Sequence, residues 1–142
     1  MSVSFPWEWG GIINFGCYLD NRRGIEIGNN VGIAHNTKIY TLGHNIDSPK
    51  FETKGAPVVI EDNVFVFSNA IIMPSVTIHE GAIVLAGSVV TKDVESRMIV
   101  GGNPAKPIRR RTATIDYKSV YNYCFALYVN LRYSRKRQFI FL

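Results

Sequence analysis

Residues 60–95 read IEDNVF VFSNAI IMPSVT IHEGAI VLAGSV VTKDVE when the chain is written in groups of six. The first place in every group is Ile or Val, and the fifth is Val, Ala or Ser. Residues 27–44 repeat this order as IGNNVG IAHNTK IYTLGH. A period of six with one large apolar place fits neither an amphipathic helix nor an alternating strand. It is typical of a parallel β-helix, in which each group forms a short strand and a turn.

The repeat also predicts how the coils stack. Three groups close one triangular coil, whose first-place side chains point into the prism and pack on those of neighbouring coils. We expect about five coils, each adding roughly 4.8 Å of height, the spacing of paired strands. A sandwich of short strands, the alternative, would show turn signals every ~8–12 residues and no fixed phase. We therefore predict an all-β fold, with a β-helix domain over residues 1–112 and a non-repeat tail over 113–142.

The stretch 39–60, IYTLGHNIDSPKFETKGAPVVI, interrupts the period. The step from Ile39 to Ile60 is 21 positions, three groups plus three extra residues, so the two blocks of repeats lie on different phases. An inserted loop over about 43–58 is therefore predicted, and it carries His44. A histidine in a loop that breaks a regular scaffold is a candidate for proton transfer, the alternative being a histidine without a task. The first block places on one phase Phe15, Ile27, Ile33 and Ile39, with Asn21 as its polar member.

Composition limits the classes of function. With 142 residues, 46% hydrophobic and 19% charged, the chain has the length and composition of one domain with a core. We find no run of 18 apolar residues that could span a membrane and no signal-peptide pattern in the first residues. Cys17 and Cys124 are too few and too far apart for a metal or disulfide framework. We expect a cytoplasmic protein.

The net charge of +5 is unevenly distributed. Residues 1–105 contain 7 Lys and Arg against 10 Asp and Glu, whereas residues 106–142 contain 9 against Asp116 alone. The basic character therefore belongs to the C-terminal part and does not indicate a nucleic-acid-binding fold, so we expect no nucleic-acid partner.

The tail over 113–142 is aromatic as well as basic, with five of the seven tyrosines and no six-residue rhythm. One interpretation is a packing segment that covers an open sheet edge at the end of the prism or on a neighbouring subunit. The other is peripheral contact with the inner membrane, with aromatic side chains in the headgroup layer and the basic residues 135–137 near acidic lipid.

Three segments carry a family resemblance: residues 30–44 (NVGIAHNTKIYTLGH), residues 60–94 and residues 100–109 (VGGNPAKPIR). With them the chain resembles the hexapeptide-repeat acyltransferases, and more narrowly the galactoside, maltose and nodulation O-acetyltransferases and their relatives in bacterial polysaccharide clusters. The resemblance covers about residues 12–110. It implies a left-handed β-helix, a homotrimer with active sites between adjacent subunits, and acetyl-CoA as the co-substrate.

The resemblance assigns a catalytic and an acceptor-binding residue. The histidine that closes the family's TxGH element is the general base, and here it is His44. The acceptor-binding asparagine of an NF pair thirty residues upstream is Asn14. For Asn14 the alternative is a short polar side chain that satisfies nearby backbone groups.

The resemblance also implies an acetyl-CoA site. Phe65 stands where the family usually has Trp, the Ser68 amide faces the thioester carbonyl, and Ala86 lines the pantetheine arm. Phosphates attract Arg forks and Lys point charges, although solvated surface charges are the alternative. The cations expected at the nucleotide phosphates are Lys92, Lys106 and Arg109.

Departures from the family pattern concern the acceptor more than the donor. We find no counterpart of the helical N-terminal segment and its acidic acceptor contact, and the loop after His44 is shorter. The histidines also raise a rival, the zinc-dependent carbonic anhydrases of the same fold, which need a close HxxxxH pair among three ligands. Here the spacings from His35 to His44 and on to His79 are 9 and 35, so we expect no metal requirement.

Transfer of an acetyl group from a thioester to a hydroxyl needs a base, stabilisation of the oxyanion and orientation of both substrates. No Ser or Cys nucleophile beside a base is indicated, so we expect direct transfer without an acyl-enzyme. The expected function is acetyl-CoA-dependent O-acetylation of a sugar hydroxyl in surface polysaccharide or oligosaccharide biosynthesis. The alternatives are N-acetylation of an amino-sugar nucleotide, acetylation of an antibiotic, and a catalytically silent β-helix scaffold.

Overall fold

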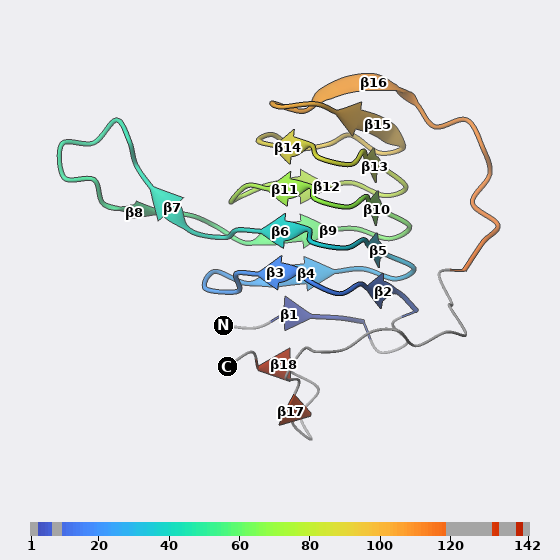
Figure 1. Cartoon of the computed structure of the whole chain (residues 1–142), viewed down its shortest axis with the longest axis horizontal. Coiled ribbons are helices and arrows are strands. Elements are labelled where there is room, and N and C mark those ends of the chain that lie inside the picture. The colour runs from blue at the N-terminus through green and yellow to red at the C-terminus, as the bar shows by residue number, and fades with distance from the viewer. Residues whose placement is uncertain (1–2, 7–9, 119–131, 134–138, 141–142) are drawn as a thin grey trace.

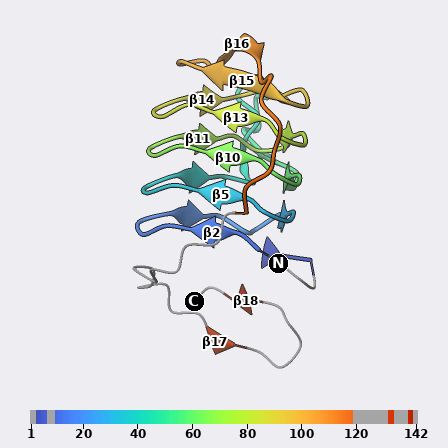
Figure 2. The ribbon, with the colours of Figure 1, turned by 90° about the vertical axis from the view of Figure 1, so that its right-hand side faces the viewer.

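The period of six winds the chain into a triangular prism (Figure 1). The computed structural model describes residues 3–6, 10–118, 132–133 and 139–140. Within these residues every regular element is a β-strand, and three largely parallel sheets form the faces of a left-handed β-helix. Successive strands of a coil belong to successive faces, so each face gathers about one strand per coil (Figure 2).

Short strands stack along each face. Face I consists of β2 (Ile12–Ile13), β5 (Gly32–Ile33), β10 (Phe65–Val66), β13 (Ile83–Val84) and β15 (Met98–Gly101). Face II consists of β3 (Tyr18–Leu19), β6 (Lys38–Ile39), β11 (Ile71–Ile72) and β14 (Val89–Val90). Face III consists of β1 (Val3–Ser4), β4 (Ile25–Ile27), β9 (Val58–Ile60) and β12 (Thr77–Ile78). These five parallel strands of face I agree with the expected number of coils.

The first and fifth places of the repeat line the interior. In residues 60–94 the first-place side chains are at most 1% exposed and the fifth-place side chains at most 3%. Parallel pairing stacks the first places in register, so that Val66 lies between Ile33 and Val84. The predicted inward orientation of the first place is confirmed, and the fifth place is buried as well. Full burial of each branched side chain contributes about 1.5–3 kcal/mol.

The fourth place of the repeat makes the turn at each corner. Its residues adopt left-handed backbone with φ between 53° and 69° at Asn30, Asn36, Asn63, Asn69 and Ser75. Asn occurs in this region more often than most residues because its short side chain can bond locally. The polar places of the repeat therefore supply the turns that let the apolar places stack.

The interior phase predicted for the first coil is wrong. Phe15 is 58% exposed and Asn21 lies outside the core, whereas Ile13 and Leu19 pack against it. The step from β2 to β5 is 20 residues, two more than the 18 from β10 to β13. Counting back in sixes from Ile27 therefore assigns the wrong residues to the interior.

The insertion is a β-hairpin at the corner between faces II and III. The pairing of β6 with β11 joins Ile39 to Ile72, a step of 33 residues where β11 to β14 takes 18. The additional residues include β7 (Gly43–His44) and β8 (Thr53–Lys54), which pair antiparallel. Figure 1 shows this hairpin extending far from the side of the prism. The residues predicted as an inserted loop therefore include a two-stranded hairpin arm.

Added strands extend one face at each end of the prism. Strand β16 (Lys106–Arg110) folds back antiparallel on β15. The chain then descends along the corner between faces III and I (Figure 2), where Arg97 Nη2 donates to the Ala113 carbonyl at 2.6 Å. Strand β18 (Phe139–Ile140) pairs with β1 at the other end, and β17 (Arg132–Tyr133) pairs with β18.

The pairing of β18 with β1 covers the open edge of face III, as the packing interpretation of the tail expects. Residues 119–131 and 134–138, on which the membrane interpretation depends, lie outside the described residues. In the described part of the chain, no helix has the length and apolar character needed to cross a membrane.

Replacement of Ile72 by Ala should lower the free energy of unfolding by about 2–5 kcal/mol, because it opens a cavity in an interior column. Ile71 precedes it in β11 and is only half-buried, so Ile71→Ala removes the same atoms and should cost less. Chemical denaturation of the two variants measures the difference. Equal losses would contradict the inward orientation of Ile72.

Candidate functional site

His44 is held in one orientation by Phe51, across the hairpin. Its Nδ1 lies 2.9 Å from the Phe51 carbonyl oxygen. The two rings are stacked, with centroids 4.6 Å apart and planes 5° apart. Because a carbonyl oxygen can only accept, the neutral imidazole carries its proton on Nδ1 and keeps a lone pair on Nε2. Phe51 therefore fixes both the tautomer and the plane of this exposed histidine.

The turn of the hairpin sets the direction of the Phe51 carbonyl. Phe51 has φ of 46°, an uncommon region for a bulky residue, and its N–H donates to the Ser48 carbonyl at 3.0 Å. The Asn45 N–H donates to the Glu52 carbonyl at 2.9 Å. The Ser48 hydroxyl donates to the Glu52 carboxylate and thereby lowers the pKa of Glu52. The hairpin thus has its own polar network around the residue that orients His44.

Three of the predicted site residues lie at the corner between faces I and II. Ser68 and Ala86 occupy equivalent places in successive coils, where the Gly87 N–H donates to the Ser68 carbonyl at 3.0 Å. The Ser68 N–H itself donates to no acceptor among the described residues. Asn14 lies at the same corner two coils earlier, and its Nδ2 donates to the Ile33 carbonyl at 3.3 Å. That bond fits the backbone-satisfying alternative, so acceptor binding by Asn14 stays a prediction.

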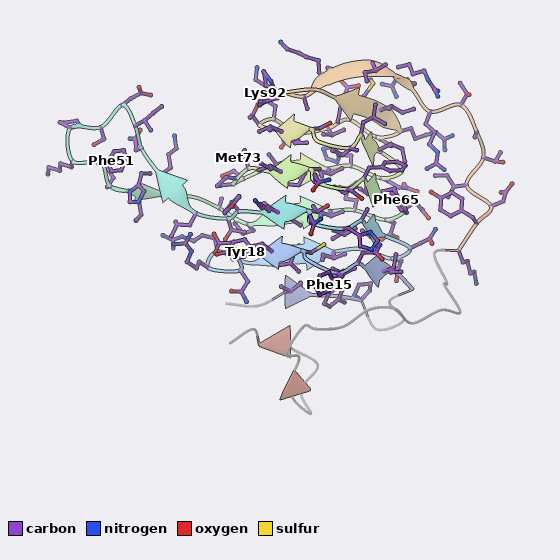
Figure 3. The ribbon with its side chains drawn as sticks, in the orientation of Figure 1. Phe15, Tyr18, Phe51, Phe65, Met73 and Lys92 are labelled. Carbon is purple, nitrogen blue, oxygen red and sulfur yellow. The ribbon has the colours of Figure 1, made fainter. Side chains whose placement is uncertain are left out.

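Phe65 lies beside this corner, on the outer side of face I (Figure 3). Its ring covers Gly32 of the preceding coil so closely that a Cβ at Gly32 would lie 2.2 Å from Phe65 Cε2. The Phe67 ring packs on it with centroids 5.0 Å apart and planes at 50°. Phe67 and Leu85 are 42% and 37% exposed and extend the apolar surface along the corner. This surface adjoins the free Ser68 amide.

The predicted phosphate-binding cations are exposed and lie in two places. Lys106 and Arg109 belong to β16, at the end of face I. Within the described ranges neither pairs with a carboxylate, whereas Arg110 beside them pairs with Glu95 at 2.9 Å. Lys92 lies at the corner between faces II and III, on the hairpin side of the prism (Figure 3).

One copy of the chain does not bring the predicted residues together. The residues at the corner between faces I and II, with Phe65, lie on one side of the prism. His44 and Lys92 belong to the corner between faces II and III, and Figure 3 shows Phe51 far out on the hairpin. A site that contains both sets of residues would need two copies of the chain.

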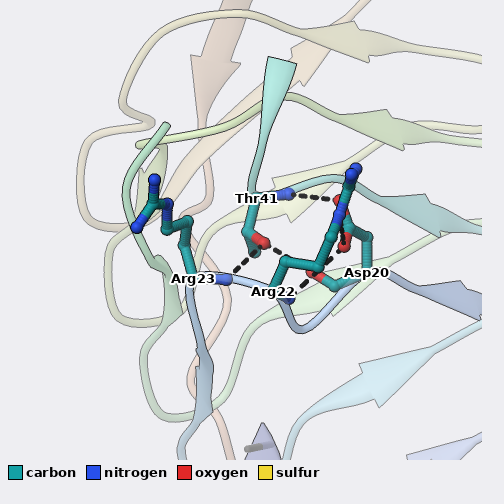
Figure 4. Close-up of polar contacts among 4 residues, drawn as sticks. All are labelled: Asp20, Arg22, Arg23 and Thr41. Carbon is teal, nitrogen blue, oxygen red and sulfur yellow. Dashed lines mark hydrogen bonds and ion pairs between the residues drawn. The ribbon is translucent and has the colours of Figure 1, made fainter. Parts of the chain in front are cut away.

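A polar cluster that the sequence did not predict lies at the base of the hairpin (Figure 4). The Asp20 carboxylate accepts from Arg22 Nε at 2.7 Å and Nη2 at 2.9 Å, and from the Thr41 N–H at 3.3 Å. The Thr41 hydroxyl donates to the Asp20 carbonyl at 2.7 Å and accepts from the Arg23 N–H at 3.0 Å. Asp20 and Thr41 are 5% and 0% exposed. The Asp-x-Arg spacing was the one sequence signal for this cluster.

No metal centre is apparent. In the part of the chain that the structure describes, no three His, Cys, Asp or Glu side chains are grouped to hold a metal ion. His79 pairs instead with Glu61, Nδ1 to Oε1 at 3.0 Å.

Replacement of Asp20 by Asn should destabilise the protein by about 1–3 kcal/mol at neutral pH, because the buried bonds from Arg22 and Thr41 favour the carboxylate. The Arg22 side chain lowers the pKa of Asp20, burial opposes that effect, and the Arg22 and Thr41 N–H groups add to it. This stabilisation is complete above the unfolded pKa of about 3.9 and is lost as the pH falls through the lower folded pKa. Denaturation curves of both proteins should therefore converge on acidification. A gap independent of pH would contradict the assignment.

Comparison with known proteins supports the sequence resemblance. The profile described as bacterial transferase hexapeptide (six repeats) matches residues 57–92. A Schizosaccharomyces pombe protein whose name assigns it to the acetyltransferases is 39% identical over 100 residues, which cover 68% of this chain and 48% of that protein. The chain spans about half the length of the curated relatives it matches.

Solved structures share the fold. A hexapeptide-repeat acetyltransferase from Vibrio cholerae in complex with acetyl-CoA has 34% identity and a TM-score of 0.70, over 77% of this chain and 60% of that one. Another structure of this acetyltransferase has 30% identity and a TM-score of 0.57, over 76% and 70%. Galactoside acetyltransferase in complex with coenzyme A has 28% identity and a TM-score of 0.63, over 82% and 66%. The chain belongs to the hexapeptide-repeat acetyltransferase family.

Proposed function

We propose that the protein transfers the acetyl group of acetyl-CoA to a sugar hydroxyl, with His44 as the general base. The observation that carries this proposal is the bond from His44 Nδ1 to the Phe51 carbonyl at 2.9 Å, which in the neutral ring leaves the Nε2 lone pair available on an exposed arm. A neutral imidazole held in this way suits removal of an alcohol proton. The acetyl-CoA and coenzyme A in the related structures support the choice of donor.

The reaction is a direct transfer. The acceptor oxygen attacks the thioester carbonyl carbon while its proton passes to His44 Nε2, and the carbonyl oxygen becomes an oxyanion. Backbone N–H groups stabilise such a charge when they are fixed in place, and the free Ser68 amide is the group assigned to this role. The carbon–sulfur bond then breaks, the thiolate takes the proton from His44, and an acetyl ester and coenzyme A leave.

The active site is shared between copies of the chain. Strand β7, which ends at His44, extends away from the corner between faces I and II of its own prism (Figure 1). In a homotrimer each hairpin reaches the corresponding corner of the next copy, and cyclic symmetry closes the arrangement. Phe65 and its neighbours then provide an apolar wall for the pantetheine arm, and Lys106 and Arg109, which pair with no carboxylate among the described residues, bind the phosphates.

The acceptor distinguishes O-acetylation from N-acetylation, and coenzyme A binding distinguishes both from a scaffold. An amine acceptor would use the same base and donor, so a panel of sugars, amino sugars and nucleotide sugars decides between ester and amide formation. A silent scaffold would fold normally without binding coenzyme A. Calorimetry with coenzyme A therefore separates the scaffold from both enzymes.

The His44→Ala variant should lose at least about 100-fold in turnover, because removal of a general base typically costs 10²–10⁴-fold. Coenzyme A binding should be retained. Thiol release from acetyl-CoA with the acceptor panel measures the first effect, and calorimetry measures the second. The matched control is His79→Ala, since His79 pairs with Glu61 at the corner between faces III and I.

Turnover that survives in His44→Ala, or that falls equally in His79→Ala, would refute the role of His44. Acetyl label that remains on the wild-type protein after exposure to acetyl-CoA would refute direct transfer.

A further inference from the structure

Backbone bonds between coils become sparse where the hairpin leaves the prism. On the entering side the last is from the Tyr40 N–H to the Ile72 carbonyl at 2.9 Å. On the returning side the ladder resumes at the Ala56 carbonyl, which accepts from the Ser75 N–H at 3.4 Å, and continues at the Val58 N–H, which donates to the Gly24 carbonyl at 3.2 Å. The direction in which the hairpin leaves is therefore not set by the ladder that orders the rest of the chain.

The arm of the hairpin packs little against the rest of its own chain. Among the described strands, β7 and β8 pair only with each other, and the residues from His44 to Lys54 are mostly exposed. Ile46 is 81% exposed and Phe51 is 56% exposed. A small rotation at the base would consequently move His44, which lies three residues beyond Thr41.

Side-chain bonds hold this base where backbone bonds do not. The Thr41 hydroxyl joins the Asp20 carbonyl at 2.7 Å to the Arg23 N–H at 3.0 Å, so it ties the entering strand to the coil before it. The Asp20 carboxylate receives the Thr41 N–H at 3.3 Å. The fork of Arg22 fixes that carboxylate, and a charged, two-point bond of this kind restricts orientation strongly.

On the returning side of the hairpin, Gly55 lies directly against the backbone of Thr41. A Cβ at Gly55 would lie 2.2 Å from the Thr41 carbonyl oxygen and 2.8 Å from Leu42 Cα. The two ends of the hairpin are thus in direct backbone contact, and Thr41 is the residue that both the coil below and the returning chain touch.

We propose that Thr41, fixed by Asp20, is a positioning residue that aims the hairpin and with it His44 Nε2. The proposal rests on the proposed function only for the task of Nε2, because the aim of the hairpin can be measured without activity. Neither Thr41 nor Asp20 touches a reacting atom in this arrangement. Their effect is transmitted through the direction of the strand that carries His44.

The test compares Thr41→Val, which keeps the shape but removes the hydroxyl, with Thr41→Ser, which keeps the hydroxyl. A spin label on Ile46→Cys reports motion of the arm, in a background where Cys17 and Cys124 are replaced by Ser. Thermal unfolding, coenzyme A affinity, kcat and KM are measured for the unlabelled variants at a temperature where all are folded.

Thr41→Val should increase the mobility of the label and lower kcat about 10–100-fold, with KM for acetyl-CoA within about twofold, because misplacement of a catalytic group costs rate rather than donor binding. Thr41→Ser should behave like the wild type. Asp20→Asn should change both readouts in the same direction as Thr41→Val.

Two results separate the hypotheses. In the first, the Thr41→Val variant unfolds at a lower temperature but has the same label mobility and kcat as Thr41→Ser. Thr41 would then only stabilise the fold, and the proposal would be overturned. In the second, Thr41→Val increases the mobility of the label, but the protein shows no turnover with any acceptor. That result would support the role of Thr41 in aiming the hairpin and reject the proposed function.

Discussion

The stacking of branched apolar side chains in the interior columns is the constraint on which the structure depends. Ile33, Val66 and Val84 lie in one such column, and each parallel pairing brings the next coil into register with the last. The strands are too short to be stable singly, so each coil depends on the burial supplied by its neighbours. Left-handed asparagines at the corners satisfy the backbone geometry that this stacking requires.

The candidate site residues lie where the stacked coils are interrupted by the hairpin, or on the outer surface of the coils, which the stacking does not constrain. The hairpin replaces one regular corner and extends His44 away from the prism, with Phe51 fixing its tautomer. At another corner the regular coils present the Ser68 amide, unbonded among the described residues, beside the ring of Phe65. The rigid repeat holds one half of the site and the hairpin holds the other, which is why a second copy of the chain completes it in the proposed function.

The repeat made the fold, the inward first place and the inserted loop predictable, because the residue at the first place of every six is always large, branched and apolar. Phe15 was assigned to the interior wrongly, since a coil with two extra residues looks the same locally as a regular one. The contact of Phe51 with His44 and the bonds between Asp20 and Thr41 join residues through backbone groups, seven and 21 positions apart. Such contacts follow from the path of the hairpin and leave no periodic trace in the sequence.

Subunit complementation tests the central claim, a site built from His44 of one copy and the Ser68 and Ala86 corner of the next, most directly. His44→Ala and Ala86→Trp chains would be co-expressed with different tags, and mixed trimers would be isolated by both tags. Cyclic geometry predicts one intact site in every mixed trimer, hence about one third of wild-type turnover, from two variants that are inactive alone. Mixed trimers that bind coenzyme A but remain as inactive as their parents would contradict the account.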